Sequence, residues 1–226
     1  MLAAMYLVPL ALFVFGKGRG YYLAPAYPML LAMGSVMGER WVGGLRRGWL
    51  VTVEGIFFAG VAAFGALFIA ILIPVTESGP VRDFSLKING DLREEFGWQE
   101  MVRNVAAIRD SLSAEQRTNM GVMTGNYGEQ GAVEMLGPQF NLPEPMGLTN
   151  SAWLRGYPAS QPTIVIVVGF SKEGVDDHFT NCRLAGHIGN REGIRNEESE
   201  DHSDIFVCGP PRLGWARFWA ENQRYG

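Results

Sequence analysis

The chain has 226 residues, 47% of them hydrophobic and 19% charged, and its formal net charge is −4. Residues 1–80 carry five basic and three acidic side chains, which leaves fourteen basic and twenty acidic side chains for residues 81–226. An acidic region without a basic stripe repels phosphate backbones, so we expect no nucleic acid among the partners.

Two apolar segments open the chain, at residues 1–15 and 21–37. The first has no basic residue ahead of it and no small-residue cleavage site after it, so it fits the later half of a membrane helix better than a signal peptide. The second is uncharged for 17 residues, with two tyrosines at an edge that suits the membrane interface. Pro25 and Pro28 cannot donate backbone hydrogen bonds, which predicts a kink near its start. Its length also fits a re-entrant or interfacial segment.

A third apolar segment, residues 55–75, contains 21 residues without a charge. A helix of this length, at about 1.5 Å per residue, matches a hydrocarbon core of about 30 Å. Three membrane spans are therefore expected within residues 1–80. Glu54 comes just before the third span, where the helix dipole favours a carboxylate near the interface, and a functional carboxylate within the membrane is the alternative.

Basic residues indicate the orientation. Residues 38–48 hold Arg40, Arg46 and Arg47, one basic residue more than the shorter loop before residue 21, so the positive-inside rule places residues 38–48 in the cytoplasm. With three spans, residues 81–226 then lie outside the cytoplasm. The expected location is the cell (inner) membrane.

Residues 81–226 are expected to form a soluble domain in which helices and strands alternate. The strongest signal is TIVIVV at residues 163–168, six consecutive β-branched residues that predict a strand buried on both faces. This alternation predicts a small α/β extramembrane domain with a mixed or parallel sheet. The other expected strands are residues 119–124 and 204–208, and the expected helices are residues 97–112, 129–136, 172–181 and 215–223.

Three segments could carry a site, and each has a simpler explanation. Residues 125–131 follow a strand and open a helix, as a phosphate loop does, but they lack its lysine and its full glycine spacing, so a structural turn is favoured. The three histidines and their acidic neighbours show no metal-ligand spacing, so they are expected to be solvent-exposed. Residues 189–203 are charged and aperiodic, which predicts a mobile solvated loop.

Cys182 and Cys208 are the two cysteines of the chain. Outside the cytoplasm they could form one disulfide that closes a loop of roughly 25 residues, worth about 3 kcal/mol. Two reduced, buried cysteines are equally compatible with the sequence.

Several runs resemble one protein family. The run GKGRGYYLAPAYP at residues 16–28, followed by an apolar helix, resembles a late transmembrane segment of bacterial members of the dolichyl-phosphate-mannose-protein mannosyltransferase family and of their aminoarabinose-transferase relatives. Later runs resemble the extramembrane C-terminal domain of the same proteins: FGW at 96–98, GNYGEQGA at 125–132, LP at 142–143, Asn150 with Trp153 and Gly156, VCGPP at 207–211, Trp215 and Trp219.

The resemblance implies a polytopic glycosyltransferase that moves a sugar from a polyprenyl-phosphate carrier to a glycan, lipid or protein acceptor. In that family the catalytic carboxylate lies in the first external loop, near the N-terminus. This chain has no such loop, so the catalytic N-terminal half is expected to be absent and the chain alone is expected to be inactive. No catalytic residue and no cofactor are expected here, and use of a divalent metal by the family is left open.

The candidate donor site is Lys17, Arg19, Tyr21 and Tyr22. The two cations are placed to attract a lipid-linked phosphate at the membrane surface, although ordinary interfacial flanking explains them equally well. Both tyrosines suit the interface, with a sugar or lipid contact as the alternative. The alternative function is a non-catalytic, membrane-anchored binding or scaffolding module that uses its extracytoplasmic α/β domain for recognition.

Overall fold

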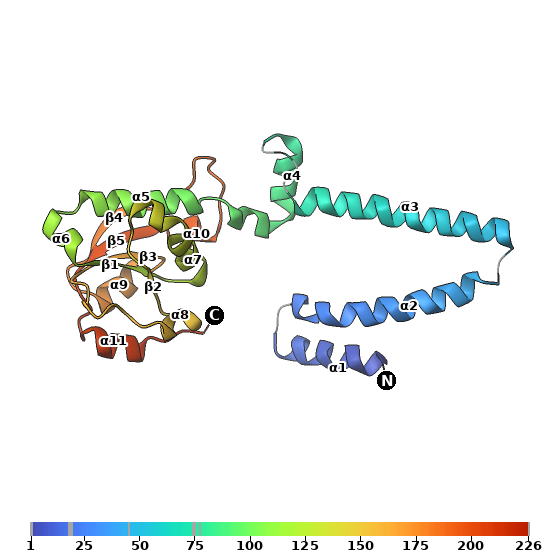
Figure 1. Ribbon diagram of the computed structural model, residues 1–226, viewed down its shortest axis with the longest axis horizontal. Coiled ribbons are helices and arrows are strands. Elements are labelled where there is room, and N and C mark those ends of the chain that lie inside the picture. The colour runs from blue at the N-terminus through green and yellow to red at the C-terminus, as the bar shows by residue number, and fades with distance from the viewer. Residues whose placement is uncertain (1, 18–19, 45, 74–75, 77, 226) are drawn as a thin grey trace. The chain divides into compact units, whose positions relative to one another are not determined.

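The computed structural model describes residues 2–17, 20–44, 46–73, 76 and 78–225. It divides into two compact units, Met1–Ile69 and Ala70–Gly226. The first unit is helical and the second is an α/β domain, as the blue and the green-to-red parts of Figure 1 show. Each unit is described by itself.

The first unit contains α1 (Leu2–Phe15), η1 (Gly20–Ala26, a 3-10 helix), α2 (Tyr27–Val42) and most of α3 (Arg47–Leu72). Among the described residues, α3 is the helix that is long and apolar enough to cross a membrane. Its 26 residues extend about 39 Å. Large apolar side chains such as Ile56 and Phe58 are 70% and 67% exposed. Water disfavours such a surface, and a bilayer favours it.

The expectation of three spans is not supported. Helix α1 has 14 residues and α2 has 16, or about 21 and 24 Å, and both fall short of a hydrocarbon core of about 30 Å. The predicted segment 21–37 is divided because residues 20–26 form η1 and α2 starts only at Tyr27. Pro28 lies in the first turn of α2, where its missing N–H breaks no helical hydrogen bond. The predicted kink is therefore a boundary between two helices.

The boundaries of the third span also differ from the prediction. Helix α3 starts eight residues before residue 55, because no proline interrupts residues 47–72, and it ends at Leu72, two residues before Pro74. Glu54 consequently lies inside α3, two turns from its first residue. The expected position of Glu54 at a helix N-terminus is wrong.

The α/β domain is built on a mixed five-stranded sheet with the order β2-β1-β3-β5-β4. Strand β1 pairs in parallel with β2 and β3, whereas β5 runs antiparallel to β3 and β4. The sequence predicted a mixed or a parallel sheet, and the sheet is mixed. The strands are β1 (Met120–Thr124), β2 (Met146–Gly147), β3 (Ile164–Val168), β4 (Arg183–His187) and β5 (Asp204–Cys208).

Helices cover both faces of this sheet. The remaining elements are α4 (Pro80–Ile88), η2 (Gly90–Glu95), α5 (Trp98–Ser111), α6 (Ala114–Thr118), α7 (Tyr127–Leu136), η3 (Gly137–Phe140), α8 (Ser151–Leu154), α9 (Lys172–His178), α10 (Glu197–Glu200) and α11 (Trp215–Glu221). Helix α9 ends three residues before the predicted residue 181, because Phe179 is extended and fully buried and bridges to Pro211.

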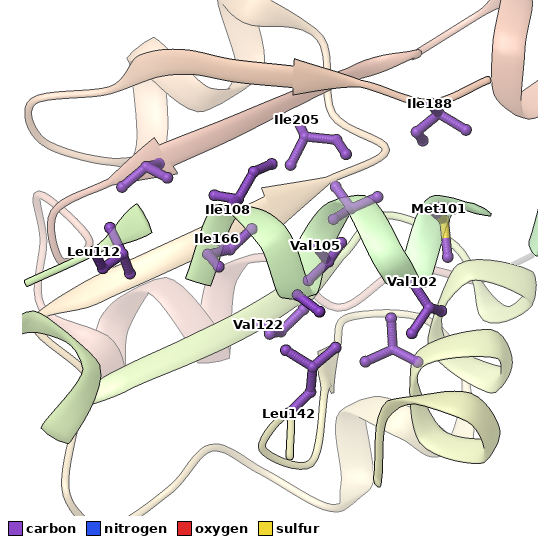
Figure 2. Close-up of a cluster of buried hydrophobic side chains, with 14 residues drawn as sticks. Met101, Val102, Val105, Ile108, Leu112, Val122, Leu142, Ile166, Ile188 and Ile205 are labelled. Atoms are coloured by element: carbon purple, nitrogen blue, oxygen red, sulfur yellow. The ribbon is translucent and has the colours of Figure 1, made fainter. Parts of the chain in front are cut away.

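Strand β3 is central, as predicted, and its side chains alternate between two cores. Ile166 and Val168 pack with α5 and α7 on one face, where Figure 2 shows Val105 and Ile108 of α5 above Val122 and Ile166. On the other face, Val165 and Val167 pack with α9 and α11. Since both faces are buried at residues 165–168, these four positions require apolar side chains.

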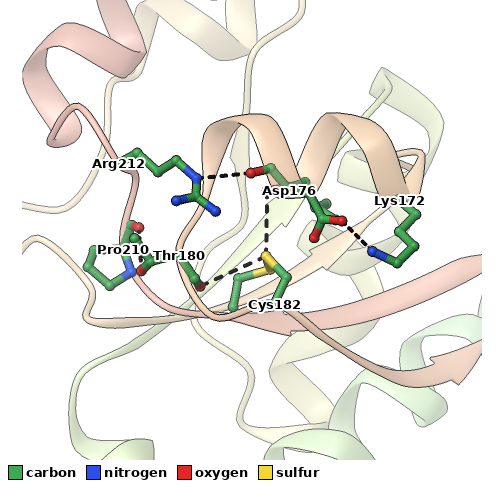
Figure 3. Close-up of a disulfide and its surroundings, with 8 residues drawn as sticks. Lys172, Asp176, Thr180, Cys182, Pro210 and Arg212 are labelled. Carbon is green, nitrogen blue, oxygen red and sulfur yellow. Dashed lines mark hydrogen bonds and ion pairs between the residues drawn. A yellow bond between two sulfur atoms is a disulfide. The ribbon is translucent and has the colours of Figure 1, made fainter.

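The structure joins Cys182 and Cys208 in a disulfide (Figure 3). Arg183 pairs with Val207 in the β4–β5 register, so the preceding Cys182 lies opposite Cys208. The bond ties the edge strand β4 to the core strand β5. By the chain-entropy estimate it is worth about 3 kcal/mol.

Substituting Val165→Asp is expected to unfold the α/β domain, because Val165 is fully buried and a lone carboxylate in a dry core lowers the free energy of unfolding by about 3 kcal/mol or more. Near-ultraviolet circular dichroism of the purified chain during heating measures this loss. Thr163→Asp is the matched control, since Thr163 is exposed just before β3. Equal melting temperatures for V165D and T163D would contradict the central placement.

Candidate functional site

The carboxyl ends of β1 and β3 form the candidate site. These two strands are parallel neighbours, and the chain leaves β1 toward β2 on one side of the sheet and β3 toward β4 and β5 on the other. A topological switch point therefore lies between them. Open α/β sheets bind their ligands in the crevice at such a point.

Two glycines let the loops after β1 and β3 approach each other closely. A Cβ on Gly125 would lie 2.2 Å from the carbonyl oxygen of Gly169, so a larger residue does not fit. Gly169 has a φ of 73°, and a Cβ there would lie 2.0 Å from Oε1 of Glu129. The carboxyl group of Glu129 thus fills the space that these two glycines leave open.

Glu129 closes the start of α7 through a capping box with Asn126. The Asn126 side chain accepts a hydrogen bond from the Glu129 N–H at 2.8 Å, and Oε2 of Glu129 accepts from the N–H groups of Gly125 and Asn126 at 2.8 and 3.3 Å. A phosphate would need these same N–H groups. The arrangement accordingly favours the structural turn over a phosphate loop at residues 125–131.

The same carboxyl group faces a second carboxyl group. Glu129 is fully buried, and its Oε1 accepts no hydrogen bond within the described part of the chain. Glu198 of α10 lies beside it, with its Oε1 accepting from Nδ2 of Asn126 at 2.9 Å. Burial, and then the neighbouring Glu198, raise the pKa of Glu129 to about 9. Glu129 is therefore neutral at pH 7 and able to share its proton with Glu198.

Residues 189–203, which connect β4 to β5, form a strap over this edge, and we call them the β4–β5 strap. Asn196 is 5% exposed and donates from Nδ2 to the carbonyl oxygen of Phe96 at 2.8 Å. The N–H of Glu197 donates to the Glu94 carboxylate at 3.1 Å. Many residues of this segment are exposed, as expected for a solvated loop, and side-chain hydrogen bonds hold it without any apolar periodicity. Its mobility stays a prediction.

Two open clefts flank the strap. One, of about 300 Å³, is lined by Phe96 and Trp98 together with acidic side chains, and the other, of about 390 Å³, is lined by strap residues alone. Trp98 donates its indole N–H to the carbonyl oxygen of Glu94 at 2.7 Å, which fixes the ring in the first cleft. An aromatic surface beside carboxylates suits a polyhydroxylated or cationic ligand and repels an anion. The acidic residues of the first cleft are Glu95, Glu100 and Glu192.

The predicted donor residues are only partly described. Lys17 lies exposed in a turn after α1, and Tyr22 is 55% exposed with its ring 5.7 Å from that of Phe13. Arg19 lies outside the described residues, and of Tyr21 only the backbone, within η1, is described. The donor site consequently stays a prediction.

The histidines have ordinary surroundings. His187 pairs with Asp204 at 2.7 Å, and the ring of His178 lies 5.6 Å from that of Phe218. Within the described ranges no three His, Cys, Asp or Glu side chains meet in an arrangement that could hold a metal ion.

Several residues that carried the family resemblance lie in the core on the far face of the sheet. Trp153 donates its indole N–H to the carbonyl oxygen of Trp219 at 2.7 Å, and Trp219 returns a hydrogen bond to that of Trp153 at 3.0 Å. Trp215 stacks on Tyr157, with the ring centroids 5.5 Å apart. These aromatic residues join α8 to α11, so their role here is packing.

Sequence reasoning did not select Glu129 and Glu198 as a pair. An asparagine followed three residues later by glutamate is a recognisable capping signal, and it could have identified Glu129 as a cap. No local sequence pattern predicts that Glu129 is buried or that it contacts Glu198, which lies 69 residues further along the chain. Comparison with protein-family models, with curated proteins and with solved structures gives no match to this chain. The functional interpretation therefore rests on the residues and their geometry.

The raised pKa of Glu129 predicts a pH-dependent stability. In the folded protein Glu129 keeps its proton up to about pH 9, whereas an unfolded glutamate loses it near pH 4.5, so this stabilisation is complete below pH 4.5 and is lost as the pH rises toward 9. The free energy of unfolding should fall by up to about 1.4 kcal/mol per pH unit within this window. Melting temperatures of the α/β domain measured from pH 5 to pH 9 follow the loss.

Glu129→Gln should flatten this pH profile, because an amide accepts from the Gly125 N–H and donates to Glu198 at every pH. Glu134→Gln is the control on the same helix, with an exposed side chain, and it should keep the wild-type slope. Parallel pH profiles for E129Q and the wild type would rule out Glu129 as the source of the pH dependence.

Proposed function

We propose that this chain is the C-terminal part of an integral-membrane glycosyltransferase that uses a polyprenyl-phosphate-linked sugar donor. The observation that carries the proposal is the order of parts: an apolar helix able to cross a membrane, α3, leads into a disulfide-bonded α/β domain. This order agrees with the family that the sequence motifs resemble. In this assignment the catalytic carboxylate belongs to the N-terminal part of the enzyme.

The disulfide supports a domain outside the cytoplasm, because such bonds persist in oxidising compartments. Arg46 and Arg47 lie at the start of α3 and the α/β domain follows its end, so a membrane-crossing α3 places them on opposite sides. By the positive-inside rule the arginines take the cytoplasmic side. We therefore assign the protein to the inner membrane with its domain outside.

The α/β domain is better suited to the acceptor than to the donor phosphate. Its sequence region is acidic, its clefts carry carboxylates, and the N–H groups at the start of α7 are occupied by Glu129. An anionic lipid phosphate would be repelled by such a surface. We assign the domain to covering the active site or receiving the acceptor.

A groove within the first unit supports the binding of an isoprenoid chain. It has a volume of about 600 Å³ and lies between α2 and α3, with walls that include Leu30, Gly34, Phe57 and Phe58. Glu39 and Glu54 also line it, and carboxylates disfavour a phosphate there. Lys17 precedes the opposite end of α2 in the chain. We infer that the groove takes the apolar chain and that Lys17 and Arg19 attract the phosphate.

The first test of this function is lipid binding. The purified chain in detergent should bind polyprenyl phosphate more tightly than polyprenol of the same length, and the K17A/R19A double variant should lose about tenfold or more in affinity for the phosphate, since a charge-assisted contact contributes about 1.5 to 3 kcal/mol. Native mass spectrometry against lipid concentration measures both. R46A, which lies beyond the other end of α2 in the chain, is the control. Equal affinity for the two lipids would favour the non-catalytic module.

The second test is topology. A membrane-impermeant thiol reagent added to intact cells should label Lys172→Cys on the exposed first turn of α9 and leave Arg47→Cys unlabelled. The two native cysteines give no background while their disulfide is intact. Permeabilised cells provide the control, in which both positions should react. Labelling of position 47 but not of position 172 in intact cells would reverse the orientation.

A further inference from the structure

The position of the β4–β5 strap follows from the strand register. Ile205, at the start of β5, pairs with Val168, the last residue of β3, so the segment that precedes β5 emerges at the edge where β1 and β3 end. The N–H of Ile188 donates to the carbonyl oxygen of Ser203 at 2.6 Å and closes the base of the strap. Figure 1 shows α10, within the strap, beside α7. The strap thus covers the switch-point crevice.

Two kinds of contact hold the strap. At one end of α10, Asn196 is held by backbone carbonyl oxygens whose hydrogen bonds do not titrate. On α10 itself, Glu198 meets the buried carboxyl group of Glu129, and both carboxyl groups accept hydrogen bonds from Asn126, at 2.9 and 3.3 Å respectively. Two ionised carboxylates side by side would repel each other, so this contact requires a positive charge or a proton between them.

Among the described residues, the main groups that act on Glu129 include no cation. From the β1–α7 loop it receives two backbone N–H groups, from the β3–α9 loop it meets Gly169, and from α10 it meets Glu198. The next titratable groups are Glu94, whose pKa is raised by burial despite the Glu197 N–H that it accepts, and Glu197 itself. The nearby basic residues are engaged with other carboxylates: Arg93 acts on Glu94, and Arg195 pairs with Glu200.

We propose that residues 189–203 form a pH-dependent strap, which one proton shared by Glu129 and Glu198 holds over the carboxyl edge of β1 and β3. Rising pH transfers this proton to water or hydroxide, and no other bond is made or broken. The two carboxylates then repel, and the strap opens at α10 while the disulfide and the sheet stay intact. Opening exposes the crevice beside Gly125 and Asn126 to ligands. The inference is independent of the proposed enzyme function.

Hydrogen exchange of the full chain in detergent tests the strap directly. The N–H groups of Ser199, Glu200 and Asp201 bond within α10 and its cap, so they report opening. After correction for the intrinsic pH dependence of exchange, their protection should fall about tenfold or more between pH 6 and pH 9, because one released proton can change the opening constant by up to tenfold per pH unit. The β3 amides should stay protected over the same range.

Three variants make the test specific. Glu129→Gln should keep the strap protected at pH 9, because its amide donates to Glu198 without titrating. Glu198→Gln should also keep the strap protected at pH 9, because its amide donates a hydrogen bond to an ionised Glu129. This variant replaces E129Q if E129Q fails to fold. Glu197→Gln, which changes an exposed neighbour, should retain the wild-type loss of protection.

Four results would overturn the proposal. Protection of the strap in the wild type could be constant from pH 6 to pH 9, or it could fall equally in E129Q and E198Q. The β3 amides could lose protection together with the strap, which would mean global unfolding. Finally, Ca²⁺ or Mg²⁺ could abolish the pH effect at millimolar concentration while EDTA opens the strap at pH 6, in which case a cation and not a proton joins the carboxylates.

Discussion

The close approach of the loops after β1 and β3 is the constraint on which the α/β domain depends. It requires glycine at residues 125 and 169, because a Cβ at either position would overlap the opposite backbone or the Glu129 carboxyl group. The same approach leaves Glu129 fully buried and beside Glu198. A capping residue that would be ordinary on a surface helix becomes a buried acid with a pKa of about 9.

This constraint connects the core to the surface strap. Strand β3 is buried on both faces and fixes where the crevice opens, while β5, antiparallel to β3, brings the β4–β5 strap back to the same edge. The disulfide ties β4 to β5 at the opposite end of these strands. The strap is therefore anchored at its base and held at its tip by hydrogen bonds and one carboxyl pair. Of these tip contacts, the carboxyl pair is the one we expect to respond to pH.

The proposed function assigns different binding tasks to the two units. The helical unit presents apolar side chains and a groove between α2 and α3, which suit a lipid. The α/β domain is acidic and has an aromatic, carboxylate-lined cleft, which suits a hydroxylated or cationic group. In the proposed function, the lipid phosphate and the acceptor are recognised by surfaces of opposite charge. Two separate surfaces are needed, because a surface that attracts an anionic phosphate does not also attract a cationic group.

The sequence by itself determined the division into an apolar N-terminal part and an α/β domain, the membrane-capable helix, and the central strand at residues 163–168, since each depends on local composition and period. It left the pairing of Cys182 with Cys208 open, and it misjudged the number of spans because apolarity does not reveal where η1 ends and α2 begins. The sequence did not predict strand β2, because two residues are too few to show a burial pattern. It did not predict strand β4, because an exposed edge strand has no such pattern. Only the tertiary structure decided the meeting of Glu129 with Glu198 and the docking of residues 189–203, because these contacts join residues that are distant in the chain and whose identities alone favour solvent.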